Sequence, residues 1–296
     1  VVGESNANAH TKSTSGAAYI FNRNGDGTWG TEVAGKSYRT PHHTLTAAGV
    51  DEPYNTNSND AEAGARFGHS VGVDGNIIVA SSFRKHTDGT EDAGAAYIFE
   101  YNGTIWEKKQ LIKPSSLAKD DEFGISIAVS GTTVVVGAHE HDTGGSNAGK
   151  AYIYERNGDG TWDTTQTKQI VPTIRGANYK FGDSVSIDGN NIIVGATGSD
   201  GKGAAYIFER NGDGTWNTNE THKIQPTELQ SGDGFGIVNI KGNYAIIGAL
   251  NDDTTVTDSG AAYIYEYNAG TSTWEKKSKI KPSTLETNSR YGGSVA

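Results

Sequence analysis

Residues 123–154 read FGISIAVSGTTVVVGAHEHDTGGSNAGKAYIY, and this stretch holds three β-strand patterns in a row. In FGISIAV (123–129) apolar residues alternate with small or polar ones, which is typical of a half-buried strand. TVVVGA (133–138) is a nearly continuous apolar run, which suits a strand buried on both faces. AYIYE (151–155) is rich in β-forming residues. Ser130-Gly131 supplies the positive φ that a tight hairpin turn needs.

The same unit occurs five times along the chain. An aromatic-glycine pair opens each copy, at spacings of 56, 58, 54 and 56 residues. Each unit also holds a Gly-x-Ala-Tyr-Ile-aromatic run, then a tryptophan that starts a fourth strand, and a proline near the end of that strand. The pairs begin at Phe67, Phe123, Phe181, Phe235 and Tyr291; the tyrosines are Tyr19, Tyr97, Tyr152, Tyr206 and Tyr263; the tryptophans, all five of the chain, are Trp29, Trp106, Trp162, Trp216 and Trp274; the prolines are Pro41, Pro114, Pro172, Pro226 and Pro282.

Four short antiparallel strands repeated at a long period predict an all-β fold, the β-propeller, in which four-stranded blades surround a central channel. A flat array is a weaker solution, because it would leave long sheet edges open. We expect one propeller domain over residues 1–296, built from five repeats of about 56 residues.

The two ends of the chain supply complementary parts of one blade. Val1-Val2-Gly3 matches Val135-Val136-Gly137, so it begins inside a second strand, whereas Tyr291–Ala296 matches a first strand. We therefore expect the C-terminal strand to complete the N-terminal blade and to close a ring of five blades. Two alternatives stay open: the chain is a portion of a larger propeller, or its last strand pairs with a neighbouring molecule.

One unit carries an insertion. Its extra residues fall in AAGVDEPYNTNSNDAEAGA (47–65), which is rich in Asn, Asp and Ala. It is either a tolerated surface insertion or a recognition loop displayed on a rigid scaffold.

The repeat resembles the FG-GAP repeat, which builds the propeller of integrin α chains and of many secreted bacterial proteins. Phe123-Gly124, Gly137-Ala138 and residues 149–154 carry the match best, and the likeness recurs five times. The resemblance implies a propeller with an extracellular adhesion or recognition role. It departs from the family in two ways. Family propellers usually have seven blades, so five repeats could be part of one, and the calcium hairpin that integrin repeats carry between strands one and two is replaced here by short turns such as Asp74-Gly75-Asn76.

Composition excludes several classes of function. The net charge of −10 and the pI of about 5.3 argue against a nucleic-acid partner and against docking on anionic lipid. No apolar run approaches the length needed to span a bilayer. The chain has no Cys and no His-Glu-x-x-His. Residues 68–72 match Gly-x-Ser-x-Gly and residues 30–37 match the P-loop spacing Gly-x4-Gly-Lys-Ser, but both motifs need a strand that runs into a helix, and no segment shows a helical period, so we do not expect an enzyme. The chain also has no Met, so we expect a processed product or a fragment.

A calcium-like spacing appears in the turn between strands three and four. Oxygen ligands fall at positions 1, 3, 5 and 9 of this turn, with Gly at position 6, and alternate residues of a tight loop can converge on one Ca²⁺. Asn-Gly-Asp-Gly is also a common turn that holds no metal. The candidate ligands are Glu155, Asn157, Asp159 and Asp163 in one turn and Glu209, Asn211, Asp213 and Asn217 in the next.

The connections between strands two and three are acidic and variable, and they meet the links to the next blade on one face. They include residues 139–147, 197–202 and 250–258, the last with Asp252. They predict either a solvated acidic rim or a binding surface for a protein, a glycan or a cation. His139 and His141 could reach a metal, but without a matching third ligand we expect surface histidines. One tryptophan per unit at a fixed position predicts packing or hairpin residues rather than sugar-stacking ones.

These observations favour a secreted or surface-exposed binding and adhesion module that uses its variable loops to recognise a protein or glycan ligand. The alternatives are a structural subunit that self-associates into an extracellular assembly, and a carbohydrate-active enzyme or lectin.

Overall fold

The protein is all-β. The structure, a computed structural model, describes residues 1–7, 15–34, 36, 39–50, 62–114, 116–253, 256–284 and 286–296. Within these residues the chain forms two compact units, Val1–Gly124 and Ile125–Ala296. Most of the predicted insertion, including residues 51–61, lies outside the described residues.

The N-terminal unit holds one complete blade and part of another. The complete blade is β6 (Phe67–Asp74), β7 (Ile77–Ser82), β8 (Ala95–Tyr101) and β9 (Trp106–Ile112), paired antiparallel in chain order. The other sheet joins β1 (Val2–Glu4), β2 (Ala17–Ile20) and β5 (His43–Leu45). A separate two-stranded ladder pairs β3 (Thr31–Glu32) with β4 (Arg39–Thr40).

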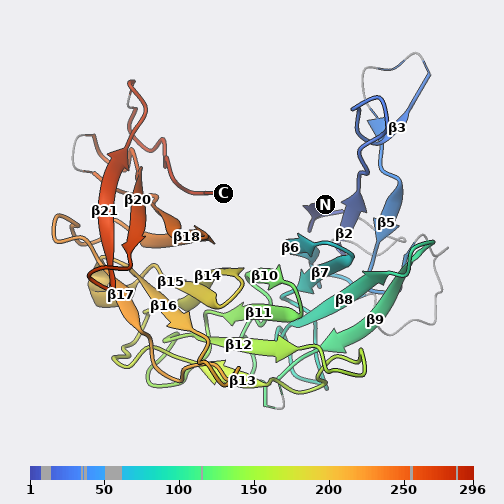
Figure 1. The fold of residues 1–296 in the computed structure, drawn as a ribbon, viewed down its shortest axis with the longest axis horizontal. Helices are drawn as coiled ribbons and strands as arrows, with labels where there is room; N and C mark the ends of the chain where they lie inside the picture. The colour runs from blue at the N-terminus through green and yellow to red at the C-terminus, as the bar shows by residue number, and fades with distance from the viewer. Residues whose placement is uncertain are drawn as a thin grey trace. The chain divides into compact units, whose positions relative to one another are not determined.

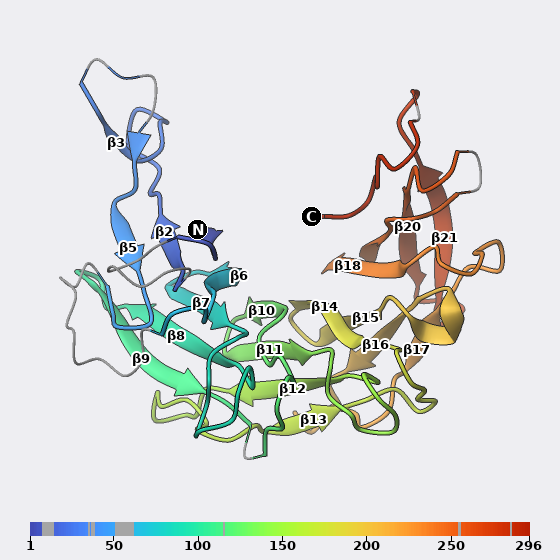
Figure 2. The ribbon, with the colours of Figure 1, turned by 180° about the vertical axis from the view of Figure 1, so that it is seen from behind.

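The C-terminal unit holds three complete blades, each an antiparallel meander (Figures 1 and 2). The first, drawn green, is β10 (Ile127–Ser130), β11 (Thr133–Ala138), β12 (Lys150–Glu155) and β13 (Lys168–Ile170). The second is β14 (Phe181–Asp188), β15 (Asn191–Ala196), β16 (Ala204–Glu209) and β17 (His222–Ile224), with the 3₁₀ turn η2 (Ser199–Gly201) before β16. The third is β18 (Phe235–Lys241), β19 (Tyr244–Ala249), β20 (Ala261–Asn268) and β21 (Thr273–Ile280).

The predicted strand order is confirmed in these four blades. Burial of strand two on both faces is confirmed in β7, β11 and nearly all of β15, whereas in β19 Tyr244 is exposed and Ile246 is half-buried. Every residue of β11 is buried. Closure of the first blade is not confirmed. In the described residues the sheet of β1 contains only β1, β2 and β5, and Tyr291 forms a single parallel bridge with Gly260 instead of a ladder.

Neighbouring blades pack through alternate residues of their strands. In one core cluster Val135, Ile153 and Ile170 of one blade pack with Val185 and Ile187 of the next. The aromatic residue of each aromatic-glycine pair packs on strand three of its own blade. The ring of Phe181 lies 5.6 Å from that of Tyr206 and 6.0 Å from that of Phe208.

The glycines of the repeat allow two blades to touch backbone to backbone. A Cβ atom on Gly137 would lie 1.9 Å from the carbonyl oxygen of Gly182, and one on Gly195 would lie 1.7 Å from that of Gly236. No side chain fits in this space. The glycine of strand two in one blade therefore contacts the glycine after the aromatic residue of the next blade, and this contact needs glycine at both positions.

Candidate functional site

The loop between strands two and three of each blade is fastened to the segment that leads into the next blade. Three carbonyl groups of one loop, those of Ser146, Asn147 and Ala148, accept the N–H groups of Asn178, Lys180 and Phe181, at N···O distances of 2.8, 3.1 and 3.0 Å. The loop itself is closed where the Gly149 N–H donates to the His141 carbonyl at 2.9 Å. We call this arrangement the loop clamp.

The loop clamp repeats at other junctions inside both units. Asp120, Glu122 and Phe123 donate to Glu91, Asp92 and Ala93, and Asn288, Arg290 and Tyr291 donate to Thr257, Asp258 and Ser259. The junction between the blades of β14–β17 and β18–β21 keeps two of the three bonds, from Gly232 to Gly201 and from Phe235 to Lys202.

The clamp holds backbone in the left-handed region. Lys180 has a φ of 55° and Arg290 one of 51°, a conformation that costs about 1 kcal/mol or more for residues with long side chains. Asn147 and Asn178, with φ of 52° and 61°, adopt it more readily. An Asp or Asn three residues before the aromatic residue marks the clamp in the sequence, as at Asp120, Asn178 and Asn288, but it is not among the landmarks that define the repeat.

The clamped loop between β7 and β8 of the N-terminal unit carries exposed charged side chains. Glu91 pairs with Lys119 at 2.7 Å, and both side chains are more than half exposed. The hydrogen bond from Lys119 lowers the pKa of Glu91, and the same contact raises the pKa of Lys119. His86 Nδ1 lies 3.1 Å from Glu62 Oε1. Lys119, from the link to the next blade, thus partly neutralises the acidic side chain of Glu91 on this loop.

The prediction of a solvated acidic rim is wrong for Asp252, because the structure buries this residue completely. Its carboxylate lies 2.6 Å from Lys279 Nζ and 3.0 Å from Lys281 Nζ, and the Tyr263 hydroxyl donates to it at 2.7 Å. Burial raises the pKa of Tyr263, and the Asp252 charge raises it further. Asp252 is an internal anchor for its loop, so it is not available to an outside ligand.

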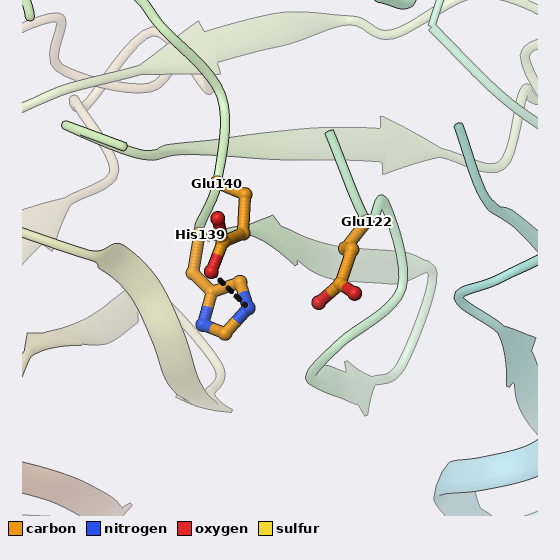
Figure 3. A group of neighbouring side chains, drawn as sticks. All are labelled: Glu122, His139 and Glu140. Carbon is orange, nitrogen blue, oxygen red and sulfur yellow. Dashed lines mark ion pairs between the residues drawn. The ribbon is translucent and has the colours of Figure 1, made fainter. Parts of the chain in front are cut away.

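His139 is also buried, contrary to the expectation of a surface histidine, with 9% of its area exposed. Its Nδ1 lies 2.7 Å from Asp183 Oδ1, and Thr197 donates to Asp183 Oδ2 at 2.7 Å. Burial acts to raise the pKa of Asp183, but the hydrogen bond and charge of His139 outweigh it and lower that pKa. Figure 3 shows His139 beside Glu140, with Nε2 to Oε1 at 3.7 Å. His141 instead accepts the backbone N–H of Thr143 at its Nδ1.

The predicted calcium turns are held by donors of the protein itself. Asp159 Oδ1 accepts both the N–H and the hydroxyl of Thr161, which lowers the pKa of Asp159. Asp213 and Thr215 repeat these bonds, and the side chains of Asn157 and Asn211 donate to the same two threonines.

The other predicted calcium ligands also have partners within the protein. Glu155 pairs with Arg210 of the next blade, Asp163 accepts the Thr167 hydroxyl, and Glu209 lies 3.8 Å from His222. Asn217 donates its backbone N–H to the Glu209 carbonyl. A calcium ion at these turns stays a prediction.

The tryptophans occupy the hairpin position that the sequence predicts. Trp106 pairs across the hairpin with Tyr101, and Trp274 pairs with Tyr267, with ring centroids 5.4 and 5.5 Å apart. Trp216 stacks under Arg210 at 5.2 Å and is 3% exposed. Trp29 is 57% exposed.

Comparisons with known proteins agree with the repeat. The family model described as FG-GAP repeat matches residues 57–99, 106–154, 164–208 and 218–265. Among curated proteins, none matches this chain significantly. In the described part of the chain, no helix is both long and apolar enough to cross a bilayer.

Solved structures similar to this chain have low sequence identity to it. A protein from Lactobacillus plantarum is 14% identical with a TM-score of 0.49, over 84% of this chain and 66% of that one. A protein of unknown function from Desulfotomaculum acetoxidans is 12% identical with a TM-score of 0.49, over 86% and 65%. A candidate 6-phosphogluconolactonase from Bacteroides uniformis is 14% identical with a TM-score of 0.47, over 86% and 67%. The chain spans about two thirds of the length of these proteins.

Proposed function

Because the chain belongs to the FG-GAP repeat family, we propose that it is an extracellular binding or adhesion module that recognises a protein or a glycan through its clamped loops. The loop clamp is the observation that supports this proposal. It fixes the backbone of loops whose side chains differ from blade to blade. A surface whose backbone is already ordered loses less conformational entropy when it binds, so variable side chains on fixed loops favour recognition.

The loop face can be tested by charge reversal. The paired change Glu91→Lys and Asp253→Lys alters two exposed side chains of the clamped loops, neither of which lies in the left-handed region, so we expect the fold to be kept. Asp26→Lys with Glu32→Lys is the matched control, because it makes the same charge change on the hairpin between strands three and four. Binding would be measured on arrays of immobilised glycans, collagen and fibronectin. The proposal expects a ligand whose binding falls at least tenfold in the loop variant alone; no bound ligand, or equal losses in both variants, would refute it.

We further propose that the five repeats close into one ring, as the alignment of the chain ends indicates. Two half-covered apolar faces support this. Val2 is 56% exposed and Tyr19 and Phe21 are half-buried, whereas their counterparts Val194, Tyr206 and Phe208 are at most 1% exposed. Ile246, Ile264 and Ile280 are half-buried, whereas their counterparts Ile193, Ile207 and Ile224 are at most 5% exposed. Each face has the residues with which complete blades cover one another.

A disulfide test distinguishes ring closure from its alternatives, because the chain has no cysteine of its own. In three of the four complete blades the fifth residue of the repeat pairs with the third-from-last residue of strand two, as Ile127 does with Val136 and Val185 with Val194. In the blade of β18–β21 a register shift gives that place to the fourth residue, Val238, opposite Ile247. The register of the other three blades places Val295 opposite Val2. We expect Val2→Cys with Val295→Cys to form a disulfide within one chain on oxidation. Disulfide-linked oligomers would favour a self-associating structural subunit, and free thiols would favour a portion of a seven-bladed propeller.

A further inference from the structure

Two pockets lie at the same place in two blades, one inside each unit. The first, with a volume of about 440 Å³, lies between the end of β5 and the start of β9. The second, of about 310 Å³, lies between β17 and the start of β21. We name them the Trp106 pocket and the Trp274 pocket, after the tryptophan that lines each. Both are near the lower end of the range of about 300–1,000 Å³ that small-ligand sites occupy.

The two pockets are built from residues at equivalent positions. A histidine lines each of them, and both histidines pair with the isoleucine that follows the repeat tyrosine: His43 with Ile20, and His222 with Ile207. Each tryptophan pairs across its hairpin with a tyrosine whose ring packs against it at a tilt of 41° or 51°. The same pair of residues, a histidine and a tryptophan, therefore lines both pockets, although the residues around the two pockets differ.

A third junction shows what the position becomes when it serves packing alone. There the residue equivalent to the histidine is Lys168, which pairs with Ile153. Its tryptophan, Trp216, is buried under Arg210, and Trp216 Nε1 donates to Glu155 at 3.3 Å.

The Trp274 pocket lacks the hydrogen bond between tryptophan and carboxylate that Trp216 makes with Glu155. The carboxylate equivalent to Glu155 is Glu209, which lies 3.8 Å from His222 Nε2. Trp274 Nε1 is buried and has no hydrogen-bond partner among the described residues. A buried N–H without an acceptor is destabilising, so this junction is not the best solution for packing alone.

The residues that line the pockets indicate which chemical class of ligand would bind there. Aromatic faces offer apolar contact over the area of one ring, and the imidazole, hydroxyl and amide groups around them can hydrogen-bond. The Trp274 pocket combines Trp274 and Tyr265 with His222, Gln225 and Thr273. A chain with a net charge of −10 disfavours phosphorylated or sulfated ligands. A pyranose ring, with one apolar face and a polar edge, fits these requirements.

We propose that the Trp106 and Trp274 pockets each bind one neutral saccharide unit of a glycan, with the tryptophan as the stacking platform. This site lies on the outer strands and is separate from the clamped loops. Two equivalent sites on one chain give a polysaccharide two points of attachment, which raises its apparent affinity where both can be reached.

The test uses cellohexaose, chitohexaose and mannohexaose in isothermal titration calorimetry, with tryptophan fluorescence as a second readout. We expect saturable binding of at least one of them with a stoichiometry near two. Thr273→Arg blocks the mouth of the Trp274 pocket without touching the core, and Ile105→Arg does the same at the Trp106 pocket, where Ile105 is 51% exposed. Each variant should lower the stoichiometry to one, and the two together should abolish binding.

Ile174→Arg is the matched control for Ile105→Arg, because Ile174 is 68% exposed and lines neither pocket. It should leave both stoichiometry and affinity within twofold of the original protein. Trp274→Phe, which keeps a ring in the hairpin, should weaken that site about tenfold while preserving the circular dichroism spectrum. The proposal is overturned if none of the three hexasaccharides binds, if heparin hexasaccharide binds in their place, or if Ile174→Arg costs as much as Ile105→Arg.

Discussion

At the scale of single residues, the repeat contains positions that accept only one type of residue. Gly137 is the clearest of them, because a Cβ there would meet a carbonyl oxygen of the next blade. We expect Gly137→Ala to lower the free energy of unfolding by about 1–3 kcal/mol through overpacking. Gly158→Ala is the control, since nothing lies within 4 Å of its added Cβ, and it should change stability by less than about 0.5 kcal/mol. Urea unfolding of both variants measures the difference, and equal effects would refute the backbone contact.

Asp252 is the second decisive residue, because two lysines depend on one buried carboxylate. We expect Asp252→Asn to lower the free energy of unfolding by about 3–5 kcal/mol, since the lysines would lose their counter-charge inside the blade. Asp253 is its exposed neighbour, and Asp253→Asn should have little effect. Thermal melting at pH 7 compares the two, and similar melting temperatures would show that Asp252 does not anchor its loop.

At the scale of elements, strands were predictable and loops were not. Burial on both faces leaves an apolar run such as TVVVGA in the sequence, and the tight turns need glycine, so both are visible in one chain. The clamp is made by backbone N–H and carbonyl groups, which every residue carries, so it leaves only the weak signal of Asp or Asn at left-handed positions. The burial of His139 depends on Asp183, 44 residues away, and the charge of the buried Asp252 is balanced by Lys279, 27 residues away, which spacing along the chain cannot reveal.

The hairpin turns give a prediction at this scale. Asp159 and Asp213 already accept two hydrogen bonds each from a threonine of the same turn. We therefore expect the turns to stay closed without a cation, and the melting temperature to be unchanged by EDTA. A lower melting temperature in EDTA that calcium restores would contradict this and establish the calcium site.

At the scale of the whole molecule, the half-buried isoleucines of the last blade report whether another blade covers it. Ile264 occupies the position of Ile207, which the next blade buries completely. If the ring closes, Ile264→Asn should cost about as much as Ile207→Asn, roughly 2–5 kcal/mol, because both would place a polar group in a packed face. Tyr244→Asn is the control, since Tyr244 is 55% exposed at the start of β19. Light scattering gives the mass alongside. A cost at Ile264 well below that at Ile207 would show that the face stays open, and a mass above that of one chain would show that a second copy covers it.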